Sequence, residues 1–412
     1  MKFKDFHINI KIRIIETFIS RFIGSMIFPF MAIYLAQYYG EGITGLLLFV
    51  NVIVGVIFNF FGGFISDRIG RRKIMMYAEI IRFFAFFTMM AFNSPWAESV
   101  LITFLMMTVN TICWGFSGPA HQAMLIDVST PEQRKLMYSI TYWANNLSIA
   151  IGGILGAFLF KDYLFELLIG LSLASLITVS LIVFFIKESY FPNQKESASF
   201  HMSDIFDTYK MVFKDRLFIW FMAAGILVLS MEFNLTNFIA IRLSEEMTNQ
   251  YFINWEIQGI QMLGFLRTEN TILVALFAIF AAKFIERFKE KNVLITGCLM
   301  FVVGYGVISF SNNIWLLFIM MIIATVGEVI RVPVEQSSMA ALPPDDARSS
   351  YMAIKGMSFN LSMLISSIVV ALGAFLSSFV MAIIITCIGL LGTTIYYLIF
   401  DKIQLRVNAN KG

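Results

Sequence analysis

Residues 63–73 read GFISDRIGRRK, a stretch that places five charges and two glycines between two long apolar runs. The runs, residues 43–65 and 74–92, are each long enough to cross a hydrocarbon layer of ~30 Å at a rise of ~1.5 Å per residue. The link between them must therefore turn at once, and Gly70 supplies the turn. Because Lys and Arg are retained on the cytoplasmic side during insertion, the stretch predicts a cytoplasmic hinge between two membrane helices.

The composition of the 412-residue chain is that of a polytopic membrane protein. Hydrophobic residues make up 58% of it and charged residues 14%, and the mean hydropathy is +0.79. A soluble core could not bury so much apolar surface. The formal net charge of +3 is too small to indicate a nucleic-acid partner. The three cysteines lie scattered in apolar runs, so neither a disulfide nor a metal site is expected.

Apolar runs of about twenty residues predict twelve membrane helices. They lie at residues 14–38, 43–66, 74–93, 99–124, 136–160, 163–186, 217–240, 270–286, 292–311, 313–336, 350–375 and 378–400. Most of the 30 basic residues fall in segments that this layout makes cytoplasmic, and both termini are cytoplasmic too. We therefore expect an all-α, multi-pass protein of the plasma membrane.

An internal repeat divides the chain into two six-helix halves. Three residues recur at one constant offset of 214 residues; they are Pro119, Gln122 and Arg134, matched by Pro333, Gln336 and Arg348. The predicted halves are residues 1–186 and 217–412, and residues 187–216 form a polar cytoplasmic linker. The external segment 243–270 is long, and its residues 255–264 look amphipathic. We expect this segment to cap the outer face or to extend the eighth helix.

Three arginines fall within predicted spans, and each has an acid nearby on its own helix. The sets are Glu16 with Arg21, Glu79 with Arg82, and Arg331 with Glu328 and Glu335. An unpaired charge at the bilayer centre costs ~2.5–3.5 kcal/mol on translocon scales. Local ion pairing is one interpretation of all three sets. For Glu16, Arg21, Glu328 and Arg331, a role in proton coupling or substrate binding is the other.

Glu328 is the best candidate for a functional acid. It lies ~21 Å along its helix from Ile314, past the midplane but short of the inner interface. A carboxylate there must face an aqueous cavity or a charged partner, and a proton and a substrate cation would compete for it. A purely structural pair with Arg331 is the alternative. Glu232, the acid in the interior of the seventh helix, is the second candidate.

Asp127 is expected at the cytoplasmic surface, because ~42 Å of helix separates it from Ser99. There it can reach the hinge. Asp67, Arg71 and Asp127 would then form an inner gate, whose pairs hold while the cavity opens outward and break when it opens inward. The alternative is an ordinary solvated turn.

The residue order G-x-x-x-D-R-x-G-R-R in the hinge resembles the loop between helices 2 and 3 of the major facilitator superfamily of secondary transporters. Residues 124–134 (MLIDVSTPEQR), 142–148 (YWANNLS) and 326–330 (VGEVI) resemble the drug:proton antiporters of that superfamily, including its lactococcal multidrug transporters. The resemblance implies that the two halves surround a midplane cavity and give alternating access.

The resemblance also implies roles for particular residues. It implies gating by Asp67 and Arg71, proton-linked switching by Asp127, and recognition of cationic drugs by Glu328. We expect four further residues at the gate: Gly63, Arg68, Gly70 and Arg134. On the fifth helix, Gly152, Gly153 and Gly156 keep the small-residue surface of an export signature without its proline, and such residues serve close helix packing equally well.

We expect a proton-coupled secondary transporter that exports lipophilic, often cationic, small molecules by antiport. Its partners would be a small-molecule substrate, protons and the lipid bilayer, and it would act as a monomer with no cofactor. No G-x-x-x-x-G-K-[ST] loop is present to hold ATP phosphates. A proton-coupled uptake symporter, or an exporter of an endogenous lipid or peptide, remains open. An enzyme is disfavoured, because the spans hold a single histidine, His121, and no H-E-x-x-H motif.

Overall fold

The computed structural model describes residues 6–189, 210, 212–252, 254–285, 287–343, 351 and 354–409. Within the helices, the side chains of some residues also lie outside the description, among them Gly63, Asp67, Arg68 and Arg134. The predicted linker falls largely on residues 190–209, outside the described part. The chain forms two compact units: the first contains residues 1–38 and 47–200, and the second contains residues 39–46 and 201–412. We call them the N half and the C half.

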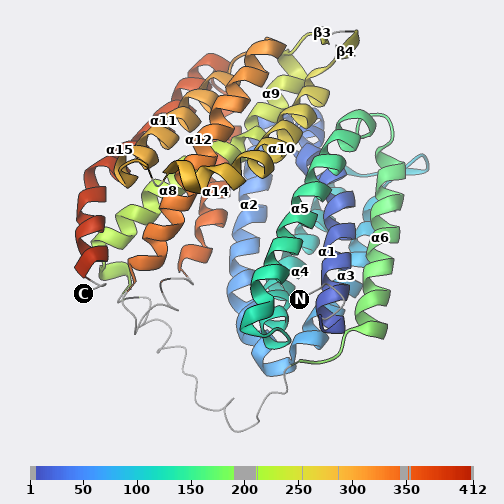
Figure 1. The fold of residues 1–412 in the computed structure, drawn as a ribbon. Coiled ribbons are helices and arrows are strands. Elements are labelled where there is room, and N and C mark those ends of the chain that lie inside the picture. Colours follow the sequence, from blue (N-terminus) through green and yellow to red (C-terminus); the bar gives the residue numbers. More distant parts are fainter. Residues whose placement is uncertain are drawn as a thin grey trace. The chain divides into compact units, whose positions relative to one another are not determined.

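The N half is a bundle of long helices joined by short links (Figure 1). Its helices are α1 (Ile8–Ile27), the 3-10 turn η2 (Phe28–Phe30), α2 (Met31–Ile69, of which residues 39–46 belong to the C half), α3 (Arg71–Ala91), α4 (Val100–Asp127), α5 (Pro131–Leu159) and α6 (Leu164–Phe185). Two short antiparallel strands, β1 (Asn93–Ser94) and β2 (Ala97–Glu98), link α3 to α4.

The C half is likewise built from helices. They are α8 (Arg216–Leu235), α9 (Phe238–Glu246), α10 (Gly259–Ile285), α11 (Glu290–Ile308), α12 (Ile314–Ala341), α14 (Ser358–Gly373) and α15 (Ser378–Ala409). An antiparallel hairpin of β3 (Gln250–Phe252) and β4 (Trp255–Ile257) precedes α10.

Glycine and proline set the breaks near the N-terminus. The helical stretch Ile8–Asn59 contains 52 residues, which at ~1.5 Å per residue would extend ~78 Å and cannot be one crossing of a ~30 Å layer. Pro29 lies in the turn η2, and Gly40 breaks the helix with a φ of 72°. Gly70, with a φ of 101°, separates α2 from α3. A positive φ of this kind favours glycine, so the predicted turn at Gly70 is confirmed.

The two halves repeat one another in structure as well as in sequence. Helices α4 and α12 are both 28 residues long, and they begin at Val100 and Ile314, the same 214-residue offset that the sequence shows. Each carries a proline inside the helix, Pro119 in α4 and Pro333 in α12. The prediction of two repeated all-helical halves is therefore confirmed.

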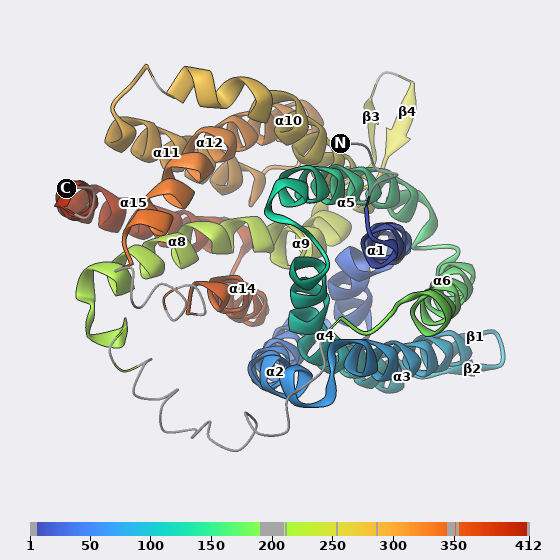
Figure 2. The same cartoon turned by 60° about the horizontal axis from the view of Figure 1, so that its bottom comes forward.

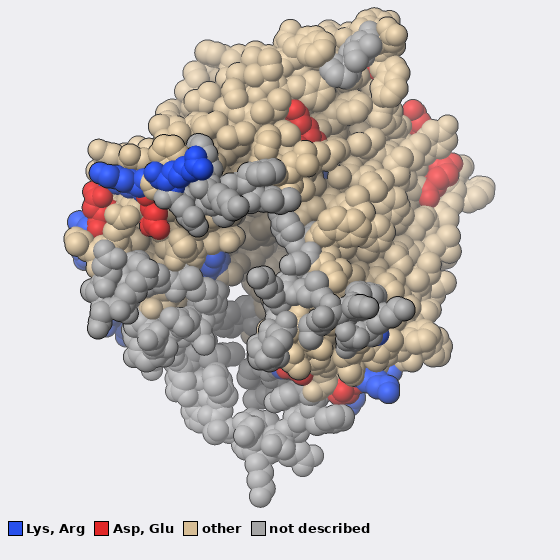
Figure 3. Space-filling model, viewed as in Figure 1, with Lys and Arg blue, Asp and Glu red and all other residues tan. Residues whose placement is uncertain are grey.

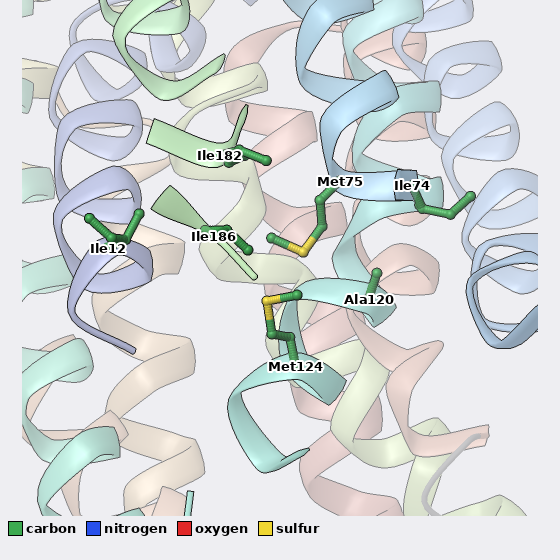
Figure 4. Packing of buried hydrophobic residues seen from close by; sticks show 7 residues of the cluster. All are labelled: Ile12, Ile74, Met75, Ala120, Met124, Ile182 and Ile186. Carbon is green, nitrogen blue, oxygen red and sulfur yellow. The ribbon is translucent and has the colours of Figure 1, made fainter. Parts of the chain in front are cut away.

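The interior of the N half is packed by apolar side chains from four helices. Figure 2 shows α1 beside α5 and α6, and α3 beside α4 and α6, in agreement with their contacts. In Figure 4, Met75 of α3 and Met124 of α4 point toward one another. Ile12 of α1, Ile182 of α6 and Ile186, which directly follows α6, complete one side of this buried cluster. Side chains packed together in this way fix the position of each helix of the N half against its neighbours.

The glycines of α5 allow it to approach α1 closely. A Cβ at Gly152 would lie 2.4 Å from the Phe22 carbonyl oxygen, and one at Gly156 would lie 2.5 Å from that of Met26. Gly153 is buried beside them. The structure thus places these residues in a close helix–helix contact, which is the packing interpretation of the sequence pattern.

The outer surface suits a lipid environment. Among the described residues, nine helical stretches are long and apolar enough to cross a membrane, and the first of them contains the two passes divided at Gly40. Many large apolar side chains are exposed, such as Phe184 at 77% and Leu398 at 66%. On the face shown in Figure 3, the described charged side chains form only small patches.

The segment before the eighth span differs partly from the expectation. Helix α10 begins at Gly259, eleven residues before the predicted start, so the prediction that the external segment extends this helix is confirmed. Residues 255–257 form a strand, so the stretch 255–264 that looks amphipathic is helical only from Gly259. A Cβ at Gly259 would lie 1.7 Å from the Leu243 carbonyl oxygen, and this contact sets where the chain can turn into the helix.

One carboxylate joins three segments at the start of α8. Asp215 Oδ2 accepts hydrogen bonds from the Tyr351 hydroxyl at 2.8 Å and from Arg406 Nη1 at 2.7 Å, and Oδ1 accepts one from the Phe218 amide at 3.2 Å. Burial would raise the pKa of Asp215, but these hydrogen bonds outweigh burial and lower the pKa below its ordinary value. The ionised form therefore stabilises this end of the C half.

We predict that Asp215→Asn lowers the free energy of unfolding by about 1–3 kcal/mol, because a charge-assisted contact is lost at nearly constant volume. A group with a lowered folded-state pKa stabilises above its unfolded pKa, so the difference between wild type and variant should vanish as the pH falls from about 4 toward about 2. Unfolding in detergent, followed by Trp fluorescence, would measure both effects.

Asp401→Asn is the matched control, since the Asp401 side chain is 69% exposed while it pairs with Lys291 at 2.6 Å. An exposed pair contributes only ~0–1 kcal/mol. Equal effects of the two substitutions would contradict the role of Asp215.

Candidate functional site

A group of polar side chains inside the C half centres on Glu328 of α12. The amide nitrogen of Asn270, on α10, donates to Glu328 Oε2 at 2.9 Å and to Thr325 Oγ1 at 3.1 Å. Thr325 lies one turn before Glu328 on the same face of α12 and is fully buried. The carboxylate expected from the sequence is therefore held by an amide of a neighbouring helix.

Arg331 pairs with the acid that follows it. Its Nη1 lies 2.7 Å from Glu335 Oε2, one turn further along α12, and its guanidinium lies 4.5 Å from the centre of the Phe301 ring of α11. The Arg331 residue is only 2% exposed. Of the two possible acidic partners, the structure pairs Arg331 directly with Glu335, whereas the nearby Glu328 carboxylate accepts a hydrogen bond from Asn270.

Glu232 of α8 belongs to the same group. It lies within electrostatic reach of Glu328, Arg331 and Arg267, the last on α10. In the described part of the chain, neither a hydrogen bond nor an ion pair reaches the Glu232 carboxylate. The site thus contains three carboxylates, Glu232, Glu328 and Glu335, and two guanidiniums, Arg267 and Arg331. We call these five residues, with Asn270 and Thr325, the carboxylate site.

Two members of the carboxylate site were missed by sequence reasoning. Arg267 was placed outside the spans and Asn270 at a helix end, because the eighth helix was begun at residue 270. The structure begins α10 at Gly259, which puts both residues inside it. Among the described residues, no hydrogen-bond partner meets the buried Nη1 of Arg267. The polar pattern R-x-x-N in a helix that starts earlier was the available signal.

The N half has its own group of buried charges, and they are paired. Arg13 forms an ion pair with Glu16 on α1, and Arg82 forms one with Glu79 on α3. Arg82 Nε also donates to Asn110 Oδ1 at 3.0 Å. The expected pairs are therefore confirmed for Glu79 and wrong for Glu16, whose partner is Arg13.

Arg21 and His121 complete the account of the N half. Arg21 is exposed. It does not share a helix face with Glu16, because five residues along a helix correspond to ~500° of rotation. His121 of α4 is 3% exposed, its ring lies 5.9 Å from that of Trp114, and no described residue bonds its nitrogens. The two carboxylates of the N-half group, Glu16 and Glu79, each pair with one guanidinium. The carboxylate site differs, because it has three carboxylates and two guanidiniums.

The hinge of the N half meets the end of α4. Arg71 Nε lies 2.6 Å from Asp127 Oδ2, and the Ser189 hydroxyl donates to the same oxygen at 3.1 Å. Glu188 accepts hydrogen bonds from the amides of Arg71 and Arg72 at 3.1–3.2 Å, which caps α3. The structure thus brings Arg71 and Asp127 together. The side chains of Asp67, Arg68 and Arg134, and Gly63, lie outside the described residues.

Comparison with known proteins assigns the family. The profile described as Major Facilitator Superfamily matches residues 14–251 and 246–411, nearly the whole chain. The chain therefore belongs to the Major Facilitator Superfamily of membrane transporters, and it is not an enzyme.

The similar proteins include cation and drug transporters. A "Na(+), Li(+), K(+)/H(+) antiporter" of Planococcus maritimus is 29% identical over 424 residues, the full length of both chains. The "Multidrug resistance protein MdtH" of Blochmanniella pennsylvanica is 24% identical, over 82% of this chain and 78% of that protein.

Solved structures confirm the fold. A peptide transporter POT in complex with sulfate aligns with a TM-score of 0.77 at 14% identity, covering 100% of this chain and 97% of the other. The nucleoside transporter NupG aligns with a TM-score of 0.72 at 14% identity, covering 95% and 99%. The predicted major facilitator fold is therefore confirmed.

We predict that Asp127→Asn reduces active transport more than about tenfold while the protein still inserts and folds. The pair is partly exposed, with side-chain exposures of 12% for Arg71 and 25% for Asp127, so it can contribute only ~0–1 kcal/mol to stability. A large loss would thus come from switching between conformations rather than from unfolding. Substrate transport by cells, with membrane insertion measured in parallel, tests this.

Ser189→Ala is the control, because it removes the second hydrogen bond to Asp127 and keeps the ion pair with Arg71. Normal transport by the Asp127→Asn variant would rule out a gating role for the pair.

Proposed function

We propose that this protein is a proton-coupled antiporter that exports lipophilic monovalent cations across the plasma membrane. The observation that carries the proposal is the carboxylate site, where three carboxylates face two guanidiniums inside a membrane-spanning half. We further propose that both termini are cytoplasmic, as the distribution of basic residues indicates.

The excess of one carboxylate determines the chemistry. A buried negative charge without a counter-charge is costly in a membrane, so the site is expected to hold either a proton or a cation. A cation that binds the ionised site displaces the proton, and a proton that binds displaces the cation. If the site faces one side of the membrane at a time, this competition becomes exchange, which is the alternating-access cycle of such transporters.

The surroundings of the site favour a cargo with apolar surface. The Phe301 and Tyr305 rings of α11 lie 4.7 Å apart, and both residues are fully buried beside the acids of the site. Aromatic faces attract cations, as the Arg331 guanidinium over the Phe301 ring illustrates, so the Tyr305 ring beside the acids would add to their attraction for an organic cation. The multidrug relatives support this choice of cargo, since they share the family and most of the chain length.

A second cargo has independent support. The relative from Planococcus maritimus matches this chain along its full length, and its name states exchange of sodium, lithium and potassium for protons. An inorganic monovalent cation carries the same single charge that the site lacks. Alkali-cation/proton antiport is therefore the second candidate function.

We predict that Glu328→Gln weakens binding of a lipophilic monocation by about ten- to hundredfold, since a charge-assisted contact is worth ~1.5–3 kcal/mol. A neutral substrate of similar size should be largely unaffected. Protons compete for the same carboxylate, so cation affinity should rise with pH in the wild type and stay flat in the variant. Ethidium binding to purified protein, and proton-driven ethidium transport in vesicles, would measure this.

Glu256→Gln is the control, because it removes an exposed acid of β4 that bonds only Asn249 among the described residues. A variant at Glu328 that loses cationic and neutral substrates equally, or that keeps pH-dependent cation binding, would contradict the assignment.

A further inference from the structure

The oxygen atoms around Asn270 converge on one point. The Asn270 amide nitrogen lies 2.9 Å from Glu328 Oε2 and 3.1 Å from Thr325 Oγ1. The Thr325 hydroxyl donates its own hydrogen to the Met321 carbonyl at 2.8 Å, so its oxygen can only accept from Asn270. Two oxygen acceptors from α12 thus face a single group of α10, and that group is now an N–H donor.

We propose that Asn270, Thr325 and Glu328 form a binding site for a small alkali cation, Li⁺ or Na⁺. The site forms when the side-chain amide of Asn270 rotates by a half-turn. In the present orientation the NH₂ group satisfies both oxygens. After a half-turn about the last side-chain bond, Asn270 Oδ1 takes its place, and three oxygens surround one cation. This inference rests on the proposed cation/proton exchange and adds the atoms that would hold an inorganic ion.

Rotation of the Asn270 side-chain amide costs little free energy. The oxygen and nitrogen of an asparagine side chain have nearly the same shape, and the bond that carries them rotates over a broad, roughly two-fold energy profile. The rotation would bring three oxygens with negative or partial negative charge together. This arrangement is unfavourable without a cation and favourable around one. The orientation of Asn270 therefore depends on whether a cation is present.

The ligand set matches the chemistry of alkali cations. One carboxylate, one amide oxygen and one hydroxyl are the hard oxygen donors that such ions prefer, and water can complete the shell. The net charge fits as well, because the three carboxylates and two guanidiniums of the carboxylate site leave one negative charge. A monovalent ion neutralises it, whereas a divalent ion would leave a buried positive charge.

The groups around the site set its response to protons. Glu232 faces Glu328 from α8, Arg267 lies on α10 and Arg331 on α12, and Tyr305 faces the acids from α11. A proton on the Glu328 carboxylate removes the only charged ligand of the triad. Alkali cations and protons are therefore mutually exclusive at this site, and cation uptake releases a proton.

The position of the triad also links it to movement. Thr325 and Glu328 are fixed to α12, while Asn270 is fixed to α10, and the two helices pack against each other. A shift of α10 along α12 would separate the amide from both oxygens. The ion is thus held only while these helices keep the register of this structure.

The test uses the full chain, purified and reconstituted into proteoliposomes with an acidic interior. Addition of Li⁺ or Na⁺ outside should release protons, seen with a pH-sensitive dye, and ethidium should do so in parallel. Thr325→Val keeps the side-chain shape and removes the oxygen, so it should weaken the apparent affinity for Li⁺ and Na⁺ by about tenfold or more and that for ethidium by less than about threefold. Thr325→Ser restores the oxygen and should restore alkali affinity.

Asn270→Leu should abolish the alkali response, and a thermal unfolding profile like that of the wild type shows that the variant is folded. If the wild type exchanges ethidium for protons but not Li⁺ or Na⁺, or if Thr325→Val reduces both cargoes equally, the alkali site is wrong and the proposed function stands. If Li⁺ or Na⁺ exchange is present and ethidium exchange is absent, the alkali site stands and the lipophilic cargo is wrong. If no cation releases protons, both proposals fail.

Discussion

The cost of a charge in a medium without water governs this structure. Hydrocarbon offers a buried guanidinium or carboxylate no hydrogen bonds, so the protein must supply the counter-charge itself. In the N half it does so with the pairs Arg13–Glu16 and Glu79–Arg82, and in the C half with Arg331–Glu335. Among the described residues of the C half, the charges that remain after this pairing include Glu232, Glu328, Glu269 and Arg267.

The two halves therefore repeat in backbone but not in electrostatics. Helices α4 and α12 have the same length and the same proline position. Yet the position that carries Glu335 in α12 carries His121 in α4, 214 residues earlier. The N-half group is neutral when its two pairs are formed, whereas the C-half group is not. The duplicated fold thus has one half whose described buried charge group is paired, and one half whose group has one more carboxylate than guanidinium.

The class of fold could be predicted from the sequence for two reasons. A helix that crosses the bilayer must have an apolar run long enough to span it, and loops rich in Lys and Arg are retained on the cytoplasmic side. The sequence also predicted the turn at Gly70, the Glu79–Arg82 pair and the position of Glu328 in the interior of a long apolar helix. It could not predict which acid Arg331 chooses, because residues three and four positions away are almost equally near on a helix. It also missed Asn270 and Arg267, since the polar start of α10 reads as a loop when hydropathy alone marks the helix. Contacts between helices, such as Asn270 with Glu328, depend on packing that no local pattern records.

The contact of α5 with α1 limits what the N half can do. Gly152 and Gly156 bring the backbone of α5 against the carbonyl oxygens of Phe22 and Met26, with no room for even one methyl group. Two helices in such contact cannot slide past each other, because any shift would drive a side chain into a main-chain oxygen. Helices α1 and α5 therefore have almost no freedom to move relative to each other. A conformational change of the protein thus cannot include relative motion of α1 and α5, and the two helices move as one rigid unit.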